Sequence, residues 1–205
     1  MSKLFNNQNF RSILRALKPW AAALVFILIL RFTGALSGIS FLTTSLLMES
    51  GVMDADPRET DQAAPDFDYD FTIKDLAGNK VNFKRYQGKV VFLNLWATWC
   101  GPCRVEMPSI QELYDGVDTT RVAFVMLSLD SDENHPKIVK YVADKKFTFP
   151  VFQPSGHLPK QLRVSSIPTT FVIGIDGKIK TTKVGAANYS SEKFKKFLKS
   201  LIPDN

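Results

Sequence analysis

Two cysteines, Cys100 and Cys103, are the only ones in this chain of 205 residues, and two residues separate them. A bridge between positions so close constrains little of the unfolded chain, so it would add little stability. The same pair can close a small disulfide ring and open it again, and the thiolate that forms on opening is a nucleophile. The spacing therefore indicates thiol–disulfide exchange rather than a structural staple.

The elements on either side of the pair would place the two sulfur atoms differently. An apolar run over residues 89–95 predicts a buried strand that ends just before the cysteines. Apolar residues then return at helical spacing, namely Met107, Ile110, Leu113 and Tyr114. Cys100 should therefore lie in the first turn of a helix, where free N–H groups and the helix dipole stabilise a thiolate. Cys103 should lie deeper and resolve the mixed disulfide by attacking Cys100.

Two residues between the cysteines suit this arrangement. Pro102 has a fixed φ that fits an early helical position, and Gly101 leaves the approach to the sulfur open. Trp99 precedes the pair, and we expect it to shield Cys100 and to shape the surface that meets a substrate.

The region from residue 66 to 205 is predicted to be one α/β domain with a mixed central sheet and flanking helices. In chain order we expect a hairpin over 67–83, strands over 89–95 and 121–129 with a helix between them, a helix from about 134, a short strand at 149–152, strands over 169–175 and 178–184, and a final helix over 194–201. Strands separated by helices imply a parallel part of the sheet. The turn at Asp176 and Gly177 adds an antiparallel edge.

Charge separates the first 48 residues from the rest of the chain. The net charge is +6, but residues 1–48 hold five basic and no acidic side chains. The remainder then has 21 basic against 20 acidic residues and is nearly neutral. The basic excess therefore gives no reason to expect a nucleic-acid partner.

Residues 20–48 form an apolar stretch whose single charge is Arg31. Since about 20 apolar residues cross a bilayer, we expect a retained single-pass anchor here, with the lipid bilayer as a partner. Residues 1–19 would be a basic cytoplasmic tail, and residues 49–65 a flexible acidic linker. Two alternatives are a signal peptide cleaved near Ala35-Leu36-Ser37 and a buried core helix.

The sequence FLNLWATWCGPCRVEMP, residues 92–108, resembles membrane-anchored bacterial thioredoxin-like proteins of the TlpA/ResA type. The resemblance covers about residues 63–205. It implies a thioredoxin-like fold with an N-terminal hairpin, a disulfide-bonded protein substrate and a membrane thiol-electron donor. We expect no cofactor and no metal. It also implies a place in the bacterial inner membrane, with the catalytic domain on the periplasmic side.

Further residue roles follow from the resemblance alone. It implies that the Ile167–Pro168 bond is cis, as X–Pro bonds can be, and that these two residues face the cysteines and help to bind substrate. Glu106 matches a family glutamate and lies at i+3 from Cys103, so we expect it to tune the thiols and relay a proton. Asn94 stands where classical thioredoxins have a buried aspartate. An exposed helical glutamate is the alternative for Glu106.

Other functions remain as alternatives to a reductant, such as one that serves cytochrome c maturation. A disulfide-forming oxidant would use the same pair. Zinc needs four ligands, and only His135 and His157, both in polar contexts, could join the cysteines. Copper binding usually involves Met or His clusters near the pair, and none is evident. A peroxidase would by resemblance need Thr three residues before the first cysteine, where this chain has Ala97.

Overall fold

The structure is a computed structural model, and it describes residues 53–56 and 65–203. The predicted tail, the anchor over 20–48 and most of the predicted linker lie outside the described residues, so these boundaries stay predictions. Within the two described ranges, none of the helices has both the length and the apolar composition that a bilayer crossing requires.

The strands of the described part form one mixed sheet, in the order β2-β1-β5-β4-β3-β6-β7. Strands β3, β4 and β5 are parallel, whereas the β1–β2 hairpin and the β6–β7 pair add antiparallel strands on either side. The strands are β1 (Thr72–Asp75), β2 (Lys80–Asn82), β3 (Val90–Trp96), β4 (Val122–Ser128), β5 (Val151–Pro154), β6 (Thr169–Ile173) and β7 (Ile179–Val184). This confirms the predicted α/β class with a mixed sheet.

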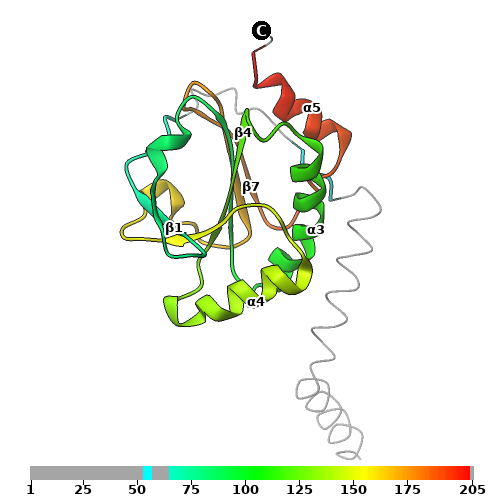
Figure 1. The fold of residues 1–205 in the computed structure, drawn as a ribbon. Helices are drawn as coiled ribbons and strands as arrows, with labels where there is room; N and C mark the ends of the chain where they lie inside the picture. The colour runs from blue at the N-terminus through cyan, green and yellow to red at the C-terminus, as the bar shows by residue number, and fades with distance from the viewer. Residues whose placement is uncertain (1–52, 57–64, 204–205) are drawn as a thin grey trace, which may run out of the picture. The chain divides into compact units, whose positions relative to one another are not determined.

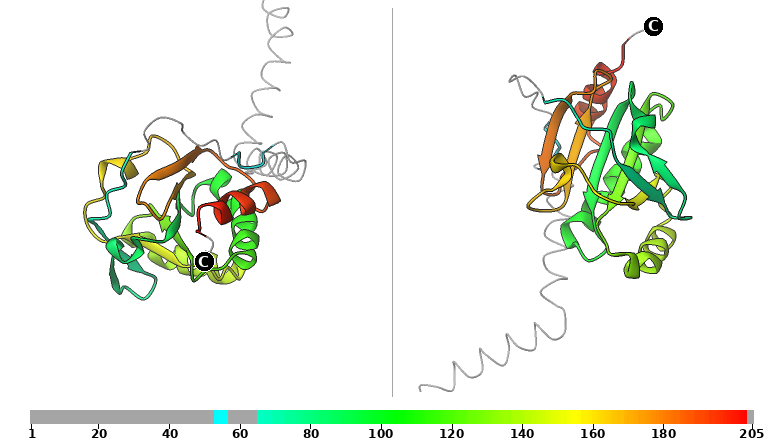
Figure 2. Two further views of the ribbon diagram at one scale, coloured as in Figure 1. Left: turned by 90° about the horizontal axis from the view of Figure 1, so that it is seen from above. Right: turned by 90° about the vertical axis from the view of Figure 1, so that its left-hand side faces the viewer.

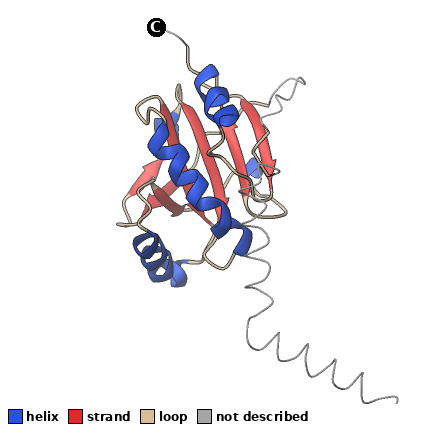
Figure 3. Ribbon diagram, turned by 90° about the vertical axis from the view of Figure 1, so that its right-hand side faces the viewer, coloured by secondary structure: helices blue, strands red, loops and turns tan. Residues whose placement is uncertain are grey.

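Helices cover one face of the sheet, and the N-terminal part of the domain covers the other (Figures 1 and 2). The helices are α3 (Gly101–Gly116), α4 (His135–Lys145) and α5 (Glu192–Ser200), and Figure 3 shows α3 and α5 in front of the sheet. Strand β3 is buried along its whole length because alternate residues enter two different cores. Phe92 packs toward the helices, whereas Leu93 packs toward the aromatic residues of the N-terminal part.

The predicted hairpin is confirmed, but its first strand is shorter than the alternating pattern indicates. Residues 67–71 are not part of a strand, although their aromatic side chains at 67, 69 and 71 are buried. These rings gather around Phe83, whose ring stacks on that of Phe71 at a centroid distance of 4.4 Å. Phe83 starts a short 3-10 helix, Phe83–Tyr86, and the Asn82 side chain caps this helix by accepting from the Lys84 N–H. Aromatic packing, not strand pairing, therefore accounts for the alternation.

The sheet register brings distant residues to the end of β3. Strand β6 pairs antiparallel with β3, which sets Thr170 opposite Asn94 and Thr169 opposite Leu95. The residues just before β6 therefore lie beside the loop that joins β3 to α3, where the cysteines are.

Candidate active site at the start of helix α3

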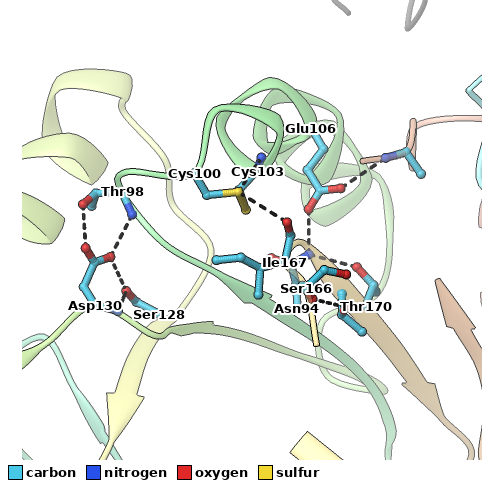
Figure 4. The surroundings of a disulfide bond; sticks show 12 residues. Asn94, Thr98, Cys100, Cys103, Glu106, Ser128, Asp130, Ser166, Ile167 and Thr170 are labelled. Carbon is cyan, nitrogen blue, oxygen red and sulfur yellow. Dashed lines mark hydrogen bonds between the residues drawn. A yellow bond between two sulfur atoms is a disulfide. The ribbon is translucent and has the colours of Figure 1, made fainter. Parts of the chain in front are cut away.

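Cys100 and Cys103 are joined by a disulfide, with their Cα atoms 5.3 Å apart (Figure 4). Cys100 is the N-cap residue of α3, and its Sγ accepts a hydrogen bond of 3.2 Å from the N–H of Cys103. This N–H and the helix dipole would stabilise negative charge on Cys100 when the bridge opens. Cys103 has no exposed surface, whereas Cys100 is 5% exposed. The predicted difference in depth is thus present, and Cys100 is the sulfur nearer to solvent.

The surface beside Cys100 is open and partly apolar. Trp99 is 69% exposed, and Gly101 and Pro102 are also exposed. A Cβ placed on Gly101 would meet no atom within 4 Å, so nothing in the described part of the chain crowds this approach. The start of the helix is therefore open at Gly101, and the exposed Trp99 directly precedes Cys100.

The loop before β6 completes the other side of the cysteine pair. The Ile167–Pro168 bond is cis, as the resemblance implied. Cys100 Sγ lies 3.7 Å from the carbonyl oxygen of Ile167 (Figure 4). In the reduced protein, a thiol at this position can donate a weak hydrogen bond to that carbonyl. Cys100 and Ile167, which are 67 positions apart in the sequence, are therefore in contact through the sulfur and the backbone carbonyl.

Glu106 is fully buried on α3, so it is not the exposed helical residue of the alternative interpretation. Its Oε1 accepts a hydrogen bond of 2.8 Å from Asn94 Nδ2, and its Oε2 accepts one of 3.2 Å from the N–H of Ala187. Burial raises the pKa of Glu106 to about 8, although the two hydrogen bonds on their own would lower it. At neutral pH the carboxyl of the bridged protein is therefore mostly protonated.

A hydrogen-bond network extends from Glu106 to residues that the sequence analysis did not identify. Asn94 Nδ2 also donates to Thr170 Oγ1 at 2.9 Å, and the Tyr189 hydroxyl donates to the same oxygen at 2.7 Å. Burial, together with the nearby charge of Glu106, raises the pKa of Tyr189 well above its usual value. The sequence carries no local signal for Thr170, Tyr189 or Ala187, because only the fold brings them next to α3.

A second buried carboxyl, Asp130, holds the loop that leads to the cysteines. Asp130 Oδ2 accepts from the backbone N–H of Thr98 at 2.8 Å and from Ser128 Oγ at 2.7 Å. Its Oδ1 accepts from the Thr98 hydroxyl at 2.7 Å. Asp130 was not among the predicted site residues, although its place just after a predicted buried strand is a usable signal. Asp130 positions Thr98, and through it the turn that presents Cys100.

We expect Asp130→Ala to destabilise the bridged protein by about 2–3 kcal/mol, because it leaves the donors of the half-buried Thr98 and the buried Ser128 without their acceptor. Urea unfolding measures this loss. Asp132→Ala is the matched control, since Asp132 is exposed and its side chain forms a surface ion pair with Lys74; it should change stability by about 0.5 kcal/mol or less. Equal unfolding midpoints for the two variants would contradict the positioning role.

Comparisons with known proteins agree with this geometry. Residues 60–182, which include both cysteines, match the AhpC/TSA family model. The chain is 36% identical over 134 residues to the thiol-disulfide oxidoreductase ResA of Bacillus thuringiensis subsp. konkukian, an alignment that covers 65% of this chain and 75% of the relative. It is 33% identical over 170 residues to the thioredoxin-like protein YneN of Bacillus subtilis, with 82% and 91% covered. The crystal structure of StoA from Bacillus subtilis matches with a TM-score of 0.51 and 29% identity, over 64% of this chain and 94% of that one.

Proposed function

Because the chain belongs to the AhpC/TSA family and is a thiol–disulfide oxidoreductase with the pair Cys100 and Cys103, we propose that it acts as a reductant of disulfides in other proteins. The observation that carries the exchange chemistry is the Cys100–Cys103 disulfide at the start of α3, with the buried Glu106 one helical turn beyond Cys103.

The first step is attack by the Cys100 thiolate on a substrate disulfide. A bond forms between Cys100 Sγ and one substrate sulfur, and the other substrate sulfur leaves as a thiolate that takes a proton from solvent. The exposed Trp99 and the backbone at Ile167 and Pro168 would hold the substrate segment beside the sulfur. The protein is then joined to its substrate through a mixed disulfide.

The second step releases the substrate. The Cys103 thiol gives its proton to the Glu106 carboxylate, and the resulting thiolate attacks Cys100 Sγ. The substrate leaves as its second thiolate, so two electrons have passed to the substrate and the pair is bridged. Glu106 now carries the proton, which is the form that its pKa of about 8 favours at neutral pH. A two-electron donor is needed to reopen the bridge; Cys100 then leaves as a thiolate and the proton held by Glu106 returns to Cys103.

We also propose where the reaction takes place and what supplies its electrons. The charge pattern around residues 20–48 supports an anchor in the bacterial inner membrane, with the domain on the periplasmic side. A dithiol in that oxidising compartment must be re-reduced, so a membrane thiol-electron donor is the expected partner. Cysteines of a haem attachment site in apocytochrome c are a candidate substrate. The names of the relatives support only the exchange chemistry itself.

The reduction potential of the pair tests the direction of the reaction. A reductant should have a potential near that of thioredoxin, about −270 mV, whereas a disulfide-forming oxidant lies near −120 mV. Equilibration of the purified protein with dithiothreitol buffers, followed by thiol alkylation and mass spectrometry, measures the potential. A value close to −120 mV would reject the reductant and favour the oxidant.

A further inference from the structure

Residues 53–56, here called the strap, lie against Asn188 near the C-terminal helix. The strap and Asn188 form a parallel β-bridge, in which the Ala55 N–H donates to the Asn188 carbonyl at 2.9 Å and the Asn188 N–H donates to the Met53 carbonyl at 2.8 Å. The Asn188 side chain also donates to Asp54 Oδ1 at 2.8 Å. Ala55 is only 1% exposed and belongs to the core under the helices. The strap is therefore a docked part of the domain.

The two neighbours of Asn188 face the opposite way, toward the redox site. The Ala187 N–H donates to Glu106 Oε2, and the Tyr189 N–H donates to Ser109 Oγ at 3.2 Å. Ala187 and Tyr189 have no exposed surface. Successive residues of an extended segment point to opposite sides, so the strap holds one side of this segment while α3 holds the other.

We propose that the strap is a positioning element of the redox site, which holds Asn188 so that the N–H of Ala187 stays directed at the Glu106 carboxyl. The inference rests on the role proposed for Glu106. It makes the segment that follows the expected anchor a part of the catalytic domain, with four residues between position 48 and the strap. Release of the strap would remove a donor that favours the ionised carboxyl.

Among the described residues, few charged groups lie around this contact. The Tyr189 phenol faces Glu106 from the segment before α5, and Cys103 lies one turn earlier on the helix of Glu106 itself. Strands β3 and β6 contribute the uncharged side chains of Asn94 and Thr170. At the strap, Asp54 bonds to Asn188, and Asp56 forms an ion pair with Lys193. A neutral substitution in the strap therefore changes the hydrogen bond to Glu106 without adding a charge.

The test is the variant Ala55→Gln in the full-length chain, kept in the bridged state in detergent. Glutamine does not fit the buried site of Ala55, so the strap should detach. We expect the pKa of Glu106, followed by 13C NMR of its carboxyl carbon and assigned with Glu106→Gln, to rise by about one pH unit. Ala143→Gln is the matched control, because Ala143 is exposed on α4, and it should leave the titration unchanged.

A second variant, Asp54→Ala, tests the inference even if Ala55→Gln does not fold. Asp54→Ala removes the acceptor for the Asn188 side chain together with one negative charge. The loss of charge alone would lower the pKa of Glu106, whereas a detached strap raises it, so the sign separates the two causes. A wild-type or lowered pKa in both variants would overturn the inference. The titration needs neither substrate nor turnover, so it can be interpreted even if the reduction potential rejects a reductant.

Discussion

Replacing Cys103 by Ser should stop the reaction at the mixed disulfide, so that the substrate remains covalently bound to Cys100. Without the second sulfur nothing resolves the bond, and turnover of a disulfide substrate such as insulin should fall by roughly a thousandfold or more. Non-reducing electrophoresis of membrane extracts, followed by mass spectrometry of the adducts, would measure the trapped fraction and identify the substrate. An apocytochrome c among the adducts would support the role in cytochrome c maturation.

Cys100→Ser is the matched control for the trap. Cys103 has no exposed surface, so it cannot reach a protein disulfide while the domain is folded. This variant should lose turnover equally and accumulate no adduct. Equal adducts in the two variants would mean that either sulfur can attack, and this would contradict the assignment of Cys100 as the nucleophile.

Glu106 should make the stability of the bridged protein fall as the pH rises. Its pKa is about 8 in the folded protein, against an ordinary value of 4.5. Between these values the folded state keeps a proton that the unfolded chain has released. The stabilisation is therefore complete below about pH 4.5 and is lost as the pH rises through 8. The difference of pKa corresponds to at most about 5 kcal/mol.

The variant Glu106→Gln isolates this effect because glutamine has a similar shape and does not ionise. Relative to the wild type, its unfolding free energy should increase between pH 5 and pH 9 by about 4 kcal/mol at most, measured by urea titration. It should also slow the resolving step by about a hundredfold, since Cys103 loses its proton acceptor. Glu112→Gln, on an exposed position of the same helix, should show no such trend. If the difference in unfolding free energy between Glu106→Gln and the wild type stayed constant with pH, Glu106 would not be a buried carboxyl with a raised pKa.

The cysteine pair and its flanking elements could be predicted because their signals are local. Strand β3, the start of α3 and the order of later strands follow from apolar periodicity within short windows. Periodicity was misleading at residues 67–71, where aromatic packing produces the same alternation as a strand. The sequence also gave no reason to bury Glu106, since a charged residue on a helix is usually exposed. Only the family resemblance pointed to it.

The remaining parts of the site depend on contacts between distant segments. Thr170 reaches Asn94 through the antiparallel register of β3 and β6, and Ala187 reaches Glu106 across 81 positions of the chain. A single sequence does not contain the register of two strands, because several pairings bury the same apolar residues. Asp130 could have been predicted from the sequence, unlike Thr170 and Ala187. It follows the carboxyl end of a buried parallel strand, and functional residues often lie at that edge of a sheet.

Because the space beside Gly101 is open, a substitution there can change the reduction potential of the cysteine pair without disturbing the packed core. A Cβ at this position, one residue after Cys100, would meet no described atom within 4 Å. Charge introduced there would change the relative energies of the dithiol and the disulfide while leaving the core intact. One surface position can therefore change the redox equilibrium of the cysteine pair.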